Sequence, residues 1–251
     1  MSQQRFKDKK VVITGAAGVF GGWIAQAFAA EGARLYLSDI RAEALEQSVG
    51  GLHASEVKRH VTDLTDEASV NDLIHSVERD WGAPDIVVNN AGIYPYRRLM
   101  TTSLEEWSQT IDLNLAAPFL LIQRFAKLMI AQGVEGSFVS MSSGAAKAAG
   151  VGMGNYSVSK VGLEMLTKTF ALELAEHRIR VNAVVPGYAP GSEVSVMTPE
   201  HTQRMIEITP LGRTSGPNDA PQAILYLSSE QASFITGATL TVDGGRTAGI
   251  L

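Results

Sequence analysis

The sequence predicts a single α/β domain built around a doubly wound parallel sheet. Short apolar runs alternate with helical patterns along all 251 residues, which is typical of parallel strands joined by covering helices. A glycine-rich turn joins the first such run to the first helix, and polar or glycine residues follow several later runs. No linker or shift in composition divides the chain, so residues 1–251 are predicted to form one domain.

The individual elements are predicted from hydrophobic periodicity. Seven apolar runs are expected to be strands, at residues 10–14, 34–38, 57–61, 85–88, 137–141, 180–184 and 239–242. Helical spacing predicts helices at 23–31, 67–81, 104–130, 156–176 and 221–228, the third of them interrupted near Asn114 and Pro118. The segment 187–214 has no clear pattern and several prolines, so it is predicted to be irregular.

Composition argues against several classes of function. A net charge of −5 without any cluster of Lys or Arg speaks against a nucleic-acid partner. The chain has no cysteine, and the spacing of its five histidines does not suit a metal, so no metal site is expected. The polar N-terminus is unlike a signal peptide, and no window approaches about 18 uninterrupted apolar residues. We therefore expect a cytoplasmic protein that does not bind membranes.

The first predicted strand, turn and helix form a pattern that suits the pyrophosphate of a dinucleotide. Gly15, Gly18 and Gly21 let the backbone approach a phosphate, and the helix N-terminus offers free N–H groups. Asp39 ends the next strand, where its carboxylate suits the ribose 2′- and 3′-hydroxyls and repels a 2′-phosphate. This favours NAD over NADP, although Arg41 could receive the phosphate. The alternative for Asp39 is a cap on the next helix.

The segment 143–160 contains a candidate acid–base pair. Tyr156 and Lys160 are four residues apart, which places both side chains on one face of a helix. A nearby ammonium favours the phenolate, so we expect the pKa of Tyr156 to be lowered toward the working range of a catalyst. Ser143 could hold a substrate oxygen against the phenol, and its 13-residue offset from Tyr156 favours it over Ser142. The same Tyr–Lys spacing also occurs by chance.

A series of motifs along nearly the whole chain favours a catalytic Tyr156–Lys160 pair over a chance spacing. They are the turn 14–21, Asp63, Asn89-Asn90-Ala91-Gly92, Asn114, Ser143, Tyr156-x-x-x-Lys160, Pro186-Gly187 and the closing Val242-Asp243-Gly244-Gly245. In this order and at these separations they resemble the single-domain branch of the short-chain dehydrogenase/reductase family. The resemblance implies a Rossmann fold, an NAD(P)-dependent oxidoreductase and a homotetramer.

The resemblance also implies a role for each motif. Tyr156 is the general acid and base, Ser143 orients the substrate oxygen, and Lys160 lowers the pKa of Tyr156 and holds the nicotinamide ribose. Asn114 positions a water that links Lys160 to solvent. The residues expected to contact the cofactor are Gly15, Ala17, Gly18, Phe20, Gly21, Asp39, Ile40, Asp63, Leu64, Asn90, Ala91, Gly92, Tyr156, Lys160, Pro186 and Gly187.

The chain departs from the family pattern at two places around the cofactor. Val19 takes the position of the usual middle glycine of the turn, which we interpret as a tolerated variant. After Pro186-Gly187 the family often has a small β-branched residue and a threonine, where this chain has Ala189-Pro190-Gly191. Ser192 is the candidate that remains for the carboxamide contact.

The expected substrate is a hydrophobic or aromatic secondary alcohol, or its ketone. Ser143, Tyr156, Tyr94 and Tyr188 are the candidate substrate contacts, and the pocket wall is expected at 94–96, 145–153 and 194–208. Lys147 and Arg97-Arg98 could instead receive an anionic group. The segment near 190–212 is expected to be a substrate lid.

Two other functions stay open from the sequence. The first is a 3-oxoacyl-(acyl-carrier-protein) reductase-like enzyme, which Asp39 disfavours because such enzymes usually use NADPH. The second is a non-catalytic NAD-binding regulatory protein on the same fold. The apolar residues of 104–130 and 160–174 exceed what one core-facing stripe needs, and the surplus predicts a subunit interface.

Overall fold

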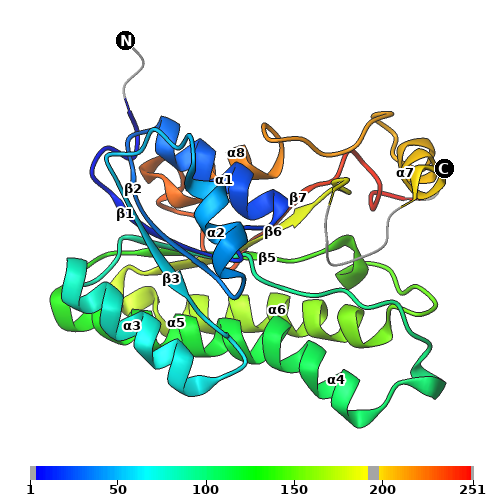
Figure 1. Ribbon diagram of the computed structural model, residues 1–251, viewed down its shortest axis with the longest axis horizontal. Helices are drawn as coiled ribbons and strands as arrows, with labels where there is room; N and C mark the ends of the chain where they lie inside the picture. The colour runs from blue at the N-terminus through cyan, green and yellow to red at the C-terminus, as the bar shows by residue number, and fades with distance from the viewer. Residues whose placement is uncertain (1–3, 192–197, 250–251) are drawn as a thin grey trace.

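The computed structural model describes residues 4–191 and 198–249. Within them the chain forms a seven-stranded sheet in the order β3-β2-β1-β4-β5-β6-β7, and every neighbouring pair is parallel. From β1 the order extends in two opposite directions, so the switch point lies between β1 and β4, the place where ligands of such sheets bind. Figure 1 shows helices on both faces of the sheet. The predicted fold class is confirmed.

The strands lie close to their predicted positions, with ends that differ by up to two residues. Their bounds are Lys10–Thr14 (β1), Arg34–Asp39 (β2), Glu56–Val61 (β3), Ile86–Asn89 (β4), Ser137–Met141 (β5), Arg180–Pro186 (β6) and Thr239–Val242 (β7). β1, β4 and β5 are almost entirely buried, which explains why they read as continuous apolar runs.

The helices form one layer on each face of the sheet. Their bounds are Val19–Ala30 (α1), Ala42–Val49 (α2), Glu67–Trp81 (α3), Leu104–Ile111 (α4), Ala117–Gln132 (α5), Gly154–Glu173 (α6), Pro199–Glu207 (α7) and Ala220–Ser228 (α8). In Figure 1, α1, α2 and α8 lie above the sheet, whereas α3, α5 and α6 lie below it.

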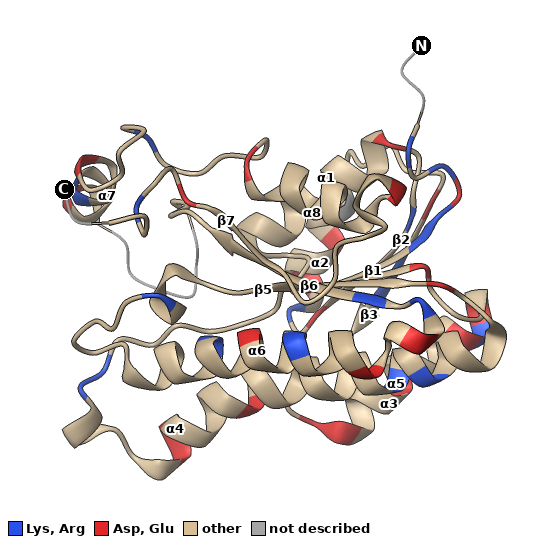
Figure 2. Cartoon of the chain, turned by 180° about the vertical axis from the view of Figure 1, so that it is seen from behind, with Lys and Arg blue, Asp and Glu red and all other residues tan. Residues whose placement is uncertain are grey.

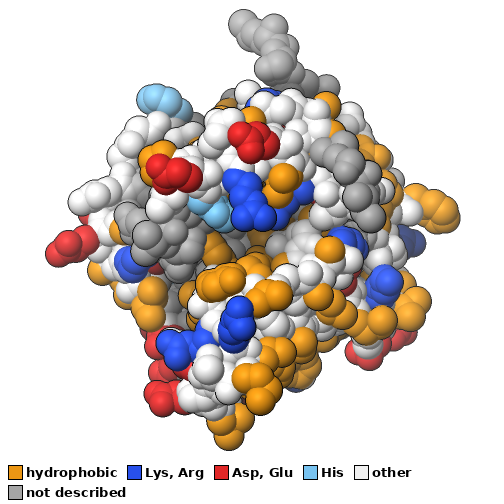
Figure 3. Space-filling view, turned by 90° about the vertical axis from the view of Figure 1, so that its right-hand side faces the viewer, with side chains coloured by type: hydrophobic (Ala, Val, Ile, Leu, Met, Phe, Trp, Pro, Cys, Tyr) orange, Lys and Arg blue, Asp and Glu red, His pale blue; other side chains and the backbone are white. Residues whose placement is uncertain are grey.

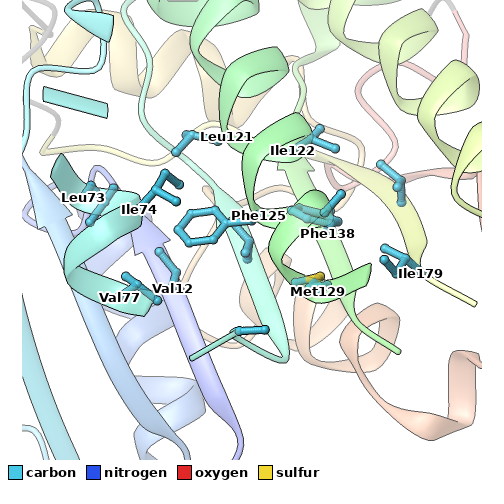
Figure 4. Packing of buried hydrophobic residues seen from close by; sticks show 14 of the residues in the cluster. Val12, Leu73, Ile74, Val77, Leu121, Ile122, Phe125, Met129, Phe138 and Ile179 are labelled. Atoms are coloured by element: carbon cyan, nitrogen blue, oxygen red, sulfur yellow. The ribbon is translucent and has the colours of Figure 1, made fainter. Parts of the chain in front are cut away.

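A hydrophobic core fills the space on each face, because successive strand residues point to opposite sides. Val12 belongs to the core shared with α3 and α5, whereas its neighbours Val11 and Ile13 belong to the core shared with α1 and α8. Figure 4 shows Phe125 of α5 beside Ile74 of α3, within the first of these cores. Packing in these two cores holds the strands in place. The candidate site residues follow the carboxyl ends of these strands.

Three helical predictions need correction. The first helix begins at Val19 rather than at residue 23, and Gly18 is its N-cap. No residue range was predicted for α2, the helix that follows Asp39. The segment 187–214 is not wholly irregular, because α7 lies within it. The Thr198 side chain accepts a hydrogen bond from the backbone N–H of His201, and Pro199 occupies the first turn. That start signal was present in the sequence.

The long apolar stretch from α4 to α5 is interrupted, as predicted, at Asn114. Residues Asp112–Ala116 form a π-helical turn. Pro118 lies in the first turn of α5, where a proline removes no hydrogen bond of the helix. Among the described residues, Leu104–Gln132 is long and apolar enough to cross a membrane, with 50% of its most apolar window buried. Since Leu121 and Phe125 pack in the core, this stretch is a core helix.

Candidate active site

The polar ends of the strands surround a hollow on one side of the molecule. Figure 3 views this side, on which α4 and α7 lie in Figure 1, and shows hydrophobic side chains along the hollow. Figure 2 shows Lys and Arg interspersed with Asp and Glu along the described elements. Within residues 4–191 and 198–249, no group of three or more His, Cys, Asp or Glu side chains could hold a metal ion.

The glycine-rich turn and the segment after β4 are packed together as one unit. Gly15 has a φ of +63°, and a Cβ there would lie 2.7 Å from the Cα of Ala91. A Cβ on Gly21 would lie 2.1 Å from the carbonyl oxygen of Gly15, so α1 can approach the turn only without a side chain. The Asn90 amide donates hydrogen bonds to the carbonyl oxygens of Thr14 and Gly15, each at 3.0 Å.

Helix α1 presents a suitable N-terminus to an anion. Its N-cap Gly18 supplies no side-chain acceptor, and its first turn carries no acidic residue. The orphan N–H groups and the dipole of the helix therefore favour a phosphate at this place. Val19 and Phe20 are the first two helical residues, and both are partly exposed.

Asp39 stabilises the glycine-rich turn from the side. Its Oδ2 accepts a hydrogen bond from the N–H of Ala17 at 3.0 Å, and its Oδ1 accepts from both the backbone N and the Nε of Arg41. The N-cap of α2 is Arg41, so the alternative that Asp39 caps this helix is wrong. The neighbouring Ile40 is 59% exposed and provides an apolar surface beside the carboxylate. Together, the open helix end, the glycine cradle and this carboxylate fit a dinucleotide.

The end of β3 lies on the same side of the sheet. Asp63 is partly exposed, and its Oδ1 accepts hydrogen bonds from the N–H and the hydroxyl of Thr65. Leu64 is buried. The carboxylate of Asp63 thus orders its own loop, and its predicted contact with an adenine stays a prediction.

Asn114 connects α5, the loop after β4 and α6. Its Nδ2 donates to the carbonyl of Ile93 at 2.7 Å and to Ser159 Oγ at 3.2 Å, and its Oδ1 accepts from the N–H of Ile93. A Cβ on Gly92 would lie 3.0 Å from this Oδ1 and 3.6 Å from Lys160 Nζ. The sequence left open that Asn114 is simply exposed, but it is completely buried.

Tyr156 lies between Ser143 and Tyr94. The Tyr94 ring centroid lies 5.9 Å from that of Tyr156, and the Ser143 hydroxyl is near enough to the phenol to lower its pKa. Burial raises the pKa of Tyr156 to about 12, the Ser143 hydrogen bond opposes this rise, and Tyr94 adds to it. The competing Ser142 donates instead to Glu164 at 2.8 Å.

Lys160 is buried one turn beyond Tyr156. Its Nζ donates to the carbonyl of Met141 at 2.8 Å and lies 5.7 Å from the Tyr156 ring centroid. Burial lowers the pKa of Lys160 to about 8. The expectation that Lys160 lowers the pKa of Tyr156 is therefore not met in this structure, because desolvation dominates both groups.

The expected substrate side is only partly described. Tyr188 follows β6, and its hydroxyl lies 3.0 Å from Thr202 of α7, with His201 against its ring. Tyr96 packs on Gly152, where a Cβ would lie 2.7 Å from the ring. Ser192, the candidate for the carboxamide contact, and residues 194–197 of the expected pocket wall lie outside the described residues.

Two of the three cationic alternatives for the substrate, Lys147 and Arg97, are paired within the protein. Lys147 forms an ion pair with Glu164 at 2.6 Å, and Arg97 forms one with Glu106 at 3.0 Å. Sequence reasoning missed Glu164 and Ser159. Both were detectable in principle, since Glu164 lies four residues after Lys160 and Ser159 directly before it on the same helix.

Comparison with known proteins agrees with this geometry. A family model described as enoyl-(acyl carrier protein) reductase matches residues 15–247. The 3-oxoacyl-(acyl-carrier-protein) reductase of Thermotoga maritima is 35% identical over 243 residues, covering 96% of this chain and 98% of the relative. Cyclopentanol dehydrogenase of a Comamonas species is 34% identical over 248 residues, covering 97% and 99%.

A solved structure agrees as well. The crystal structure of a short-chain type dehydrogenase/reductase from Mycobacterium marinum superposes with a TM-score of 0.92 at 29% identity, covering 98% of both chains. The similarity thus extends over the whole sheet and the candidate site. The chain belongs to the short-chain dehydrogenase/reductase family of oxidoreductases, whose members bind NAD or NADP.

Proposed function

We propose that this protein is an NAD-dependent oxidoreductase that interconverts a hydrophobic or aromatic secondary alcohol and its ketone. The observation that carries the proposal is that Ser143 and the buried Lys160 lie beside the phenol of Tyr156, with Lys160 Nζ 5.7 Å from its ring centroid. A phenol aligned by a hydroxyl is suited to exchange a proton with a substrate oxygen. The bound cofactor supplies the acceptor or donor of hydride at C4 of its nicotinamide ring.

The protein residues have distinct roles in this proposal. Tyr156 takes the proton from the alcohol during oxidation and returns it to the carbonyl oxygen during reduction. Ser143 donates a hydrogen bond to the same oxygen and stabilises the charge that develops on it. Lys160 carries positive charge near the phenol and holds the nicotinamide ribose. Asn114 supports the loop on which Gly92 contacts the cofactor, and a water relay through it remains part of the proposal.

The preference for NAD over NADP rests on Asp39. Its carboxylate lies at the end of β2 beside the pyrophosphate turn, where it can accept hydrogen bonds from ribose hydroxyls. A 2′-phosphate there would meet like charge. Arg41 could bind a 2′-phosphate and so favour NADP, but its Nε forms an ion pair with Asp39 at 3.2 Å. This ion pair reduces its effect on the preference for NAD.

The substrate class follows from what surrounds the phenol. The ring of Tyr94 lies against that of Tyr156 at an angle of 55°, and the basic side chains of Lys147 and Arg97 form ion pairs with glutamates. An uncharged substrate with an apolar body therefore suits the site better than an anion. A 3-oxoacyl thioester is the second candidate, because the relative from Thermotoga maritima is named for that substrate.

We also propose that the protein is a homotetramer in the cytoplasm. Apolar side chains that the single chain leaves 38–82% exposed lie on α5 and α6: Phe119, Ile130, Val158, Val161, Met165 and Leu172. Burying them between subunits removes apolar surface from water. Light scattering at micromolar concentration tests this, and a monomer would contradict it.

The experiment that tests the function is a substrate panel. The purified protein is mixed with NAD or NADP and with cyclopentanol, 1-phenylethanol or a 3-hydroxyacyl thioester, and the absorbance of the reduced nicotinamide is followed. The corresponding ketones with NADH or NADPH test the reverse direction. The proposal predicts the highest kcat/KM for an apolar alcohol with NAD. Preference for the thioester with NADP would support the second candidate, and NAD binding without any turnover would support a regulatory protein.

A further inference from the structure

Glu164 on α6 has two partners that the proposed mechanism does not use. Its Oε1 accepts a hydrogen bond from the Ser142 hydroxyl at 2.8 Å, and its Oε2 accepts from Lys147 Nζ at 2.6 Å. The Glu164 side chain is 14% exposed, and Ser142 is buried. Because Glu164 follows Lys160 by four residues, both side chains project from the same face of α6 toward the end of β5.

The two partners of Glu164 are the residues on either side of the segment that contains Ser143. Ser143 is the N-cap of the short 3-10 turn Gly144–Ala146, and Lys147 is its C-cap. The Ser143 hydroxyl accepts a hydrogen bond from the N–H of Ala145 at 3.2 Å. The Glu164 carboxylate is therefore hydrogen bonded to the residues that flank the segment 143–146 on both sides.

Further hydrogen bonds hold the end of β5. The N–H of Ser142 donates to the carbonyl of Val184 on β6 at 2.8 Å, and Lys160 Nζ donates to the carbonyl of Met141. Two consecutive residues before Ser143 are therefore held by consecutive turns of α6. The residue after the turn, Lys147, is held to α6 through Glu164.

We propose that Glu164 is a positioning residue that fixes Ser143 relative to Tyr156. The inference rests on the proposed function, in which Ser143 hydrogen bonds to the reacting oxygen. Hydrogen bonds weaken steeply with distance and angle, so a small movement of the Ser143 segment reduces stabilisation of the transition state more than binding of the substrate. Glu164 acts through Ser142 and Lys147 and does not itself touch the reacting atoms.

The two contacts are expected to contribute unequally. The Lys147 side chain is 35% exposed, and such ion pairs contribute little because solvent screens them. The Ser142 contact is less exposed and involves a carboxylate, so it is expected to be the stronger one. Glu164→Gln keeps an oxygen acceptor for Ser142 and should be mild, whereas Glu164→Leu removes both contacts.

The test compares variants with the most active alcohol of the panel and NAD. For Glu164→Leu we expect kcat to fall about 10- to 100-fold, with KM and the Kd for NAD changed by less than about threefold. Glu164→Gln should retain most of kcat. Glu173→Gln, an exposed glutamate at the end of the same helix, is the matched control and should equal the wild type.

A second readout separates positioning from general loosening of the structure. The hydrogen bond from Ser143 opposes the rise in the pKa of Tyr156. When the segment is loosened, a smaller fraction of the phenol is ionised below pH 9, so kcat should fall more for alcohol oxidation than for ketone reduction, as in Ser143→Ala. Equal losses in the two directions, in proportion to the fraction of unfolded protein, would overturn the inference.

A second variant keeps the test of Glu164 decisive if the first does not fold. If Glu164→Leu does not fold, the double variant Ser142→Ala/Lys147→Met removes the same contacts from the other side and should show the same loss of kcat. Wild-type kcat in either variant overturns the positioning role. Full activity of Ser143→Ala would instead overturn the proposed function, and this result distinguishes the two failures.

Discussion

The side-chain amide of Asn114 is hydrogen bonded to both backbone groups of Ile93, at 2.9 Å from the N–H and at 2.7 Å to the carbonyl. The π-helical turn Asp112–Ala116 carries this side chain, and a third bond joins it to Ser159 on α6. Asn114 therefore connects the loop that follows β4 with the helix that bears Tyr156. Such π-turns often occur at functional sites.

Removal of this amide should destabilise the fold and slow catalysis. In Asn114→Ala the polar groups of Ile93 lose their partners, so the free energy of unfolding should fall by about 1–3 kcal/mol. Denaturant unfolding measures it, and Asn218→Ala, at an exposed position, is the control. Equal stability of the two variants would show that the bonds to Ile93 contribute nothing.

The buried Lys160 predicts an unusual dependence of stability on pH. Its pKa is about 8 in the folded protein and near the ordinary 10.5 in the unfolded chain. Below pH 8 both states are charged, and burial of the ammonium costs about 3 kcal/mol. Between pH 8 and 10.5 the folded protein loses its proton first, so this cost disappears as the pH rises.

Lys160→Met should therefore be more stable than the wild type at neutral pH, by about 1–3 kcal/mol once the lost bond to Met141 is subtracted. The difference should shrink toward alkaline pH. Lys168→Met, at an exposed position of α6, should show no such trend. A difference that stays constant across the range would contradict the buried, partly neutral lysine.

The raised pKa of Tyr156 predicts a difference between the two reaction directions. Reduction of a ketone needs the protonated phenol, which dominates far below a pKa of about 12. Oxidation of an alcohol needs the phenolate, so its kcat should rise between about pH 6 and 9 while that of reduction does not. Initial rates in both directions measure this. A change of slope near pH 8 in either direction would report Lys160.

Cofactor choice should depend on Asp39. Asp39→Ala removes the acceptor for the ribose hydroxyls and the like charge near a 2′-phosphate, so kcat/KM should fall about 10- to 100-fold with NAD and rise with NADP. Arg41→Ala keeps the carboxylate and should still prefer NAD. Unchanged preference in Asp39→Ala would show that another residue selects the cofactor.

Much of the fold was predictable because its central strands β1, β4 and β5 are buried on both faces. Their apolar runs are bounded by polar residues and glycine, so the strand positions could be read to within two residues. The range of α2 was not predicted because most of its residues are polar or exposed, and its N-cap Arg41 provides no side-chain hydrogen bond. The start of α1 was placed too late because Gly21 and Gly22 conceal helical periodicity.

The candidate site was predictable as a set of residues but not as an electrostatic environment. The spacing of Tyr156 and Lys160 places them on one helix face, yet it does not reveal how deeply each is buried. Desolvation reverses the expected direction of the Tyr156 pKa. Likewise, the pairing of Lys147 with Glu164 needs the three-dimensional approach of α6 to the end of β5.

The central claim is that Tyr156 exchanges a proton with the substrate oxygen during hydride transfer. The most direct measurement compares wild type and Tyr156→Phe for the oxidation of the best alcohol of the panel, with binding of NADH followed separately by its fluorescence. If Tyr156 exchanges this proton, Tyr156→Phe should lose turnover by at least about 100-fold while binding NADH with a nearly unchanged Kd. Substantial turnover by Tyr156→Phe would show that another group exchanges the proton.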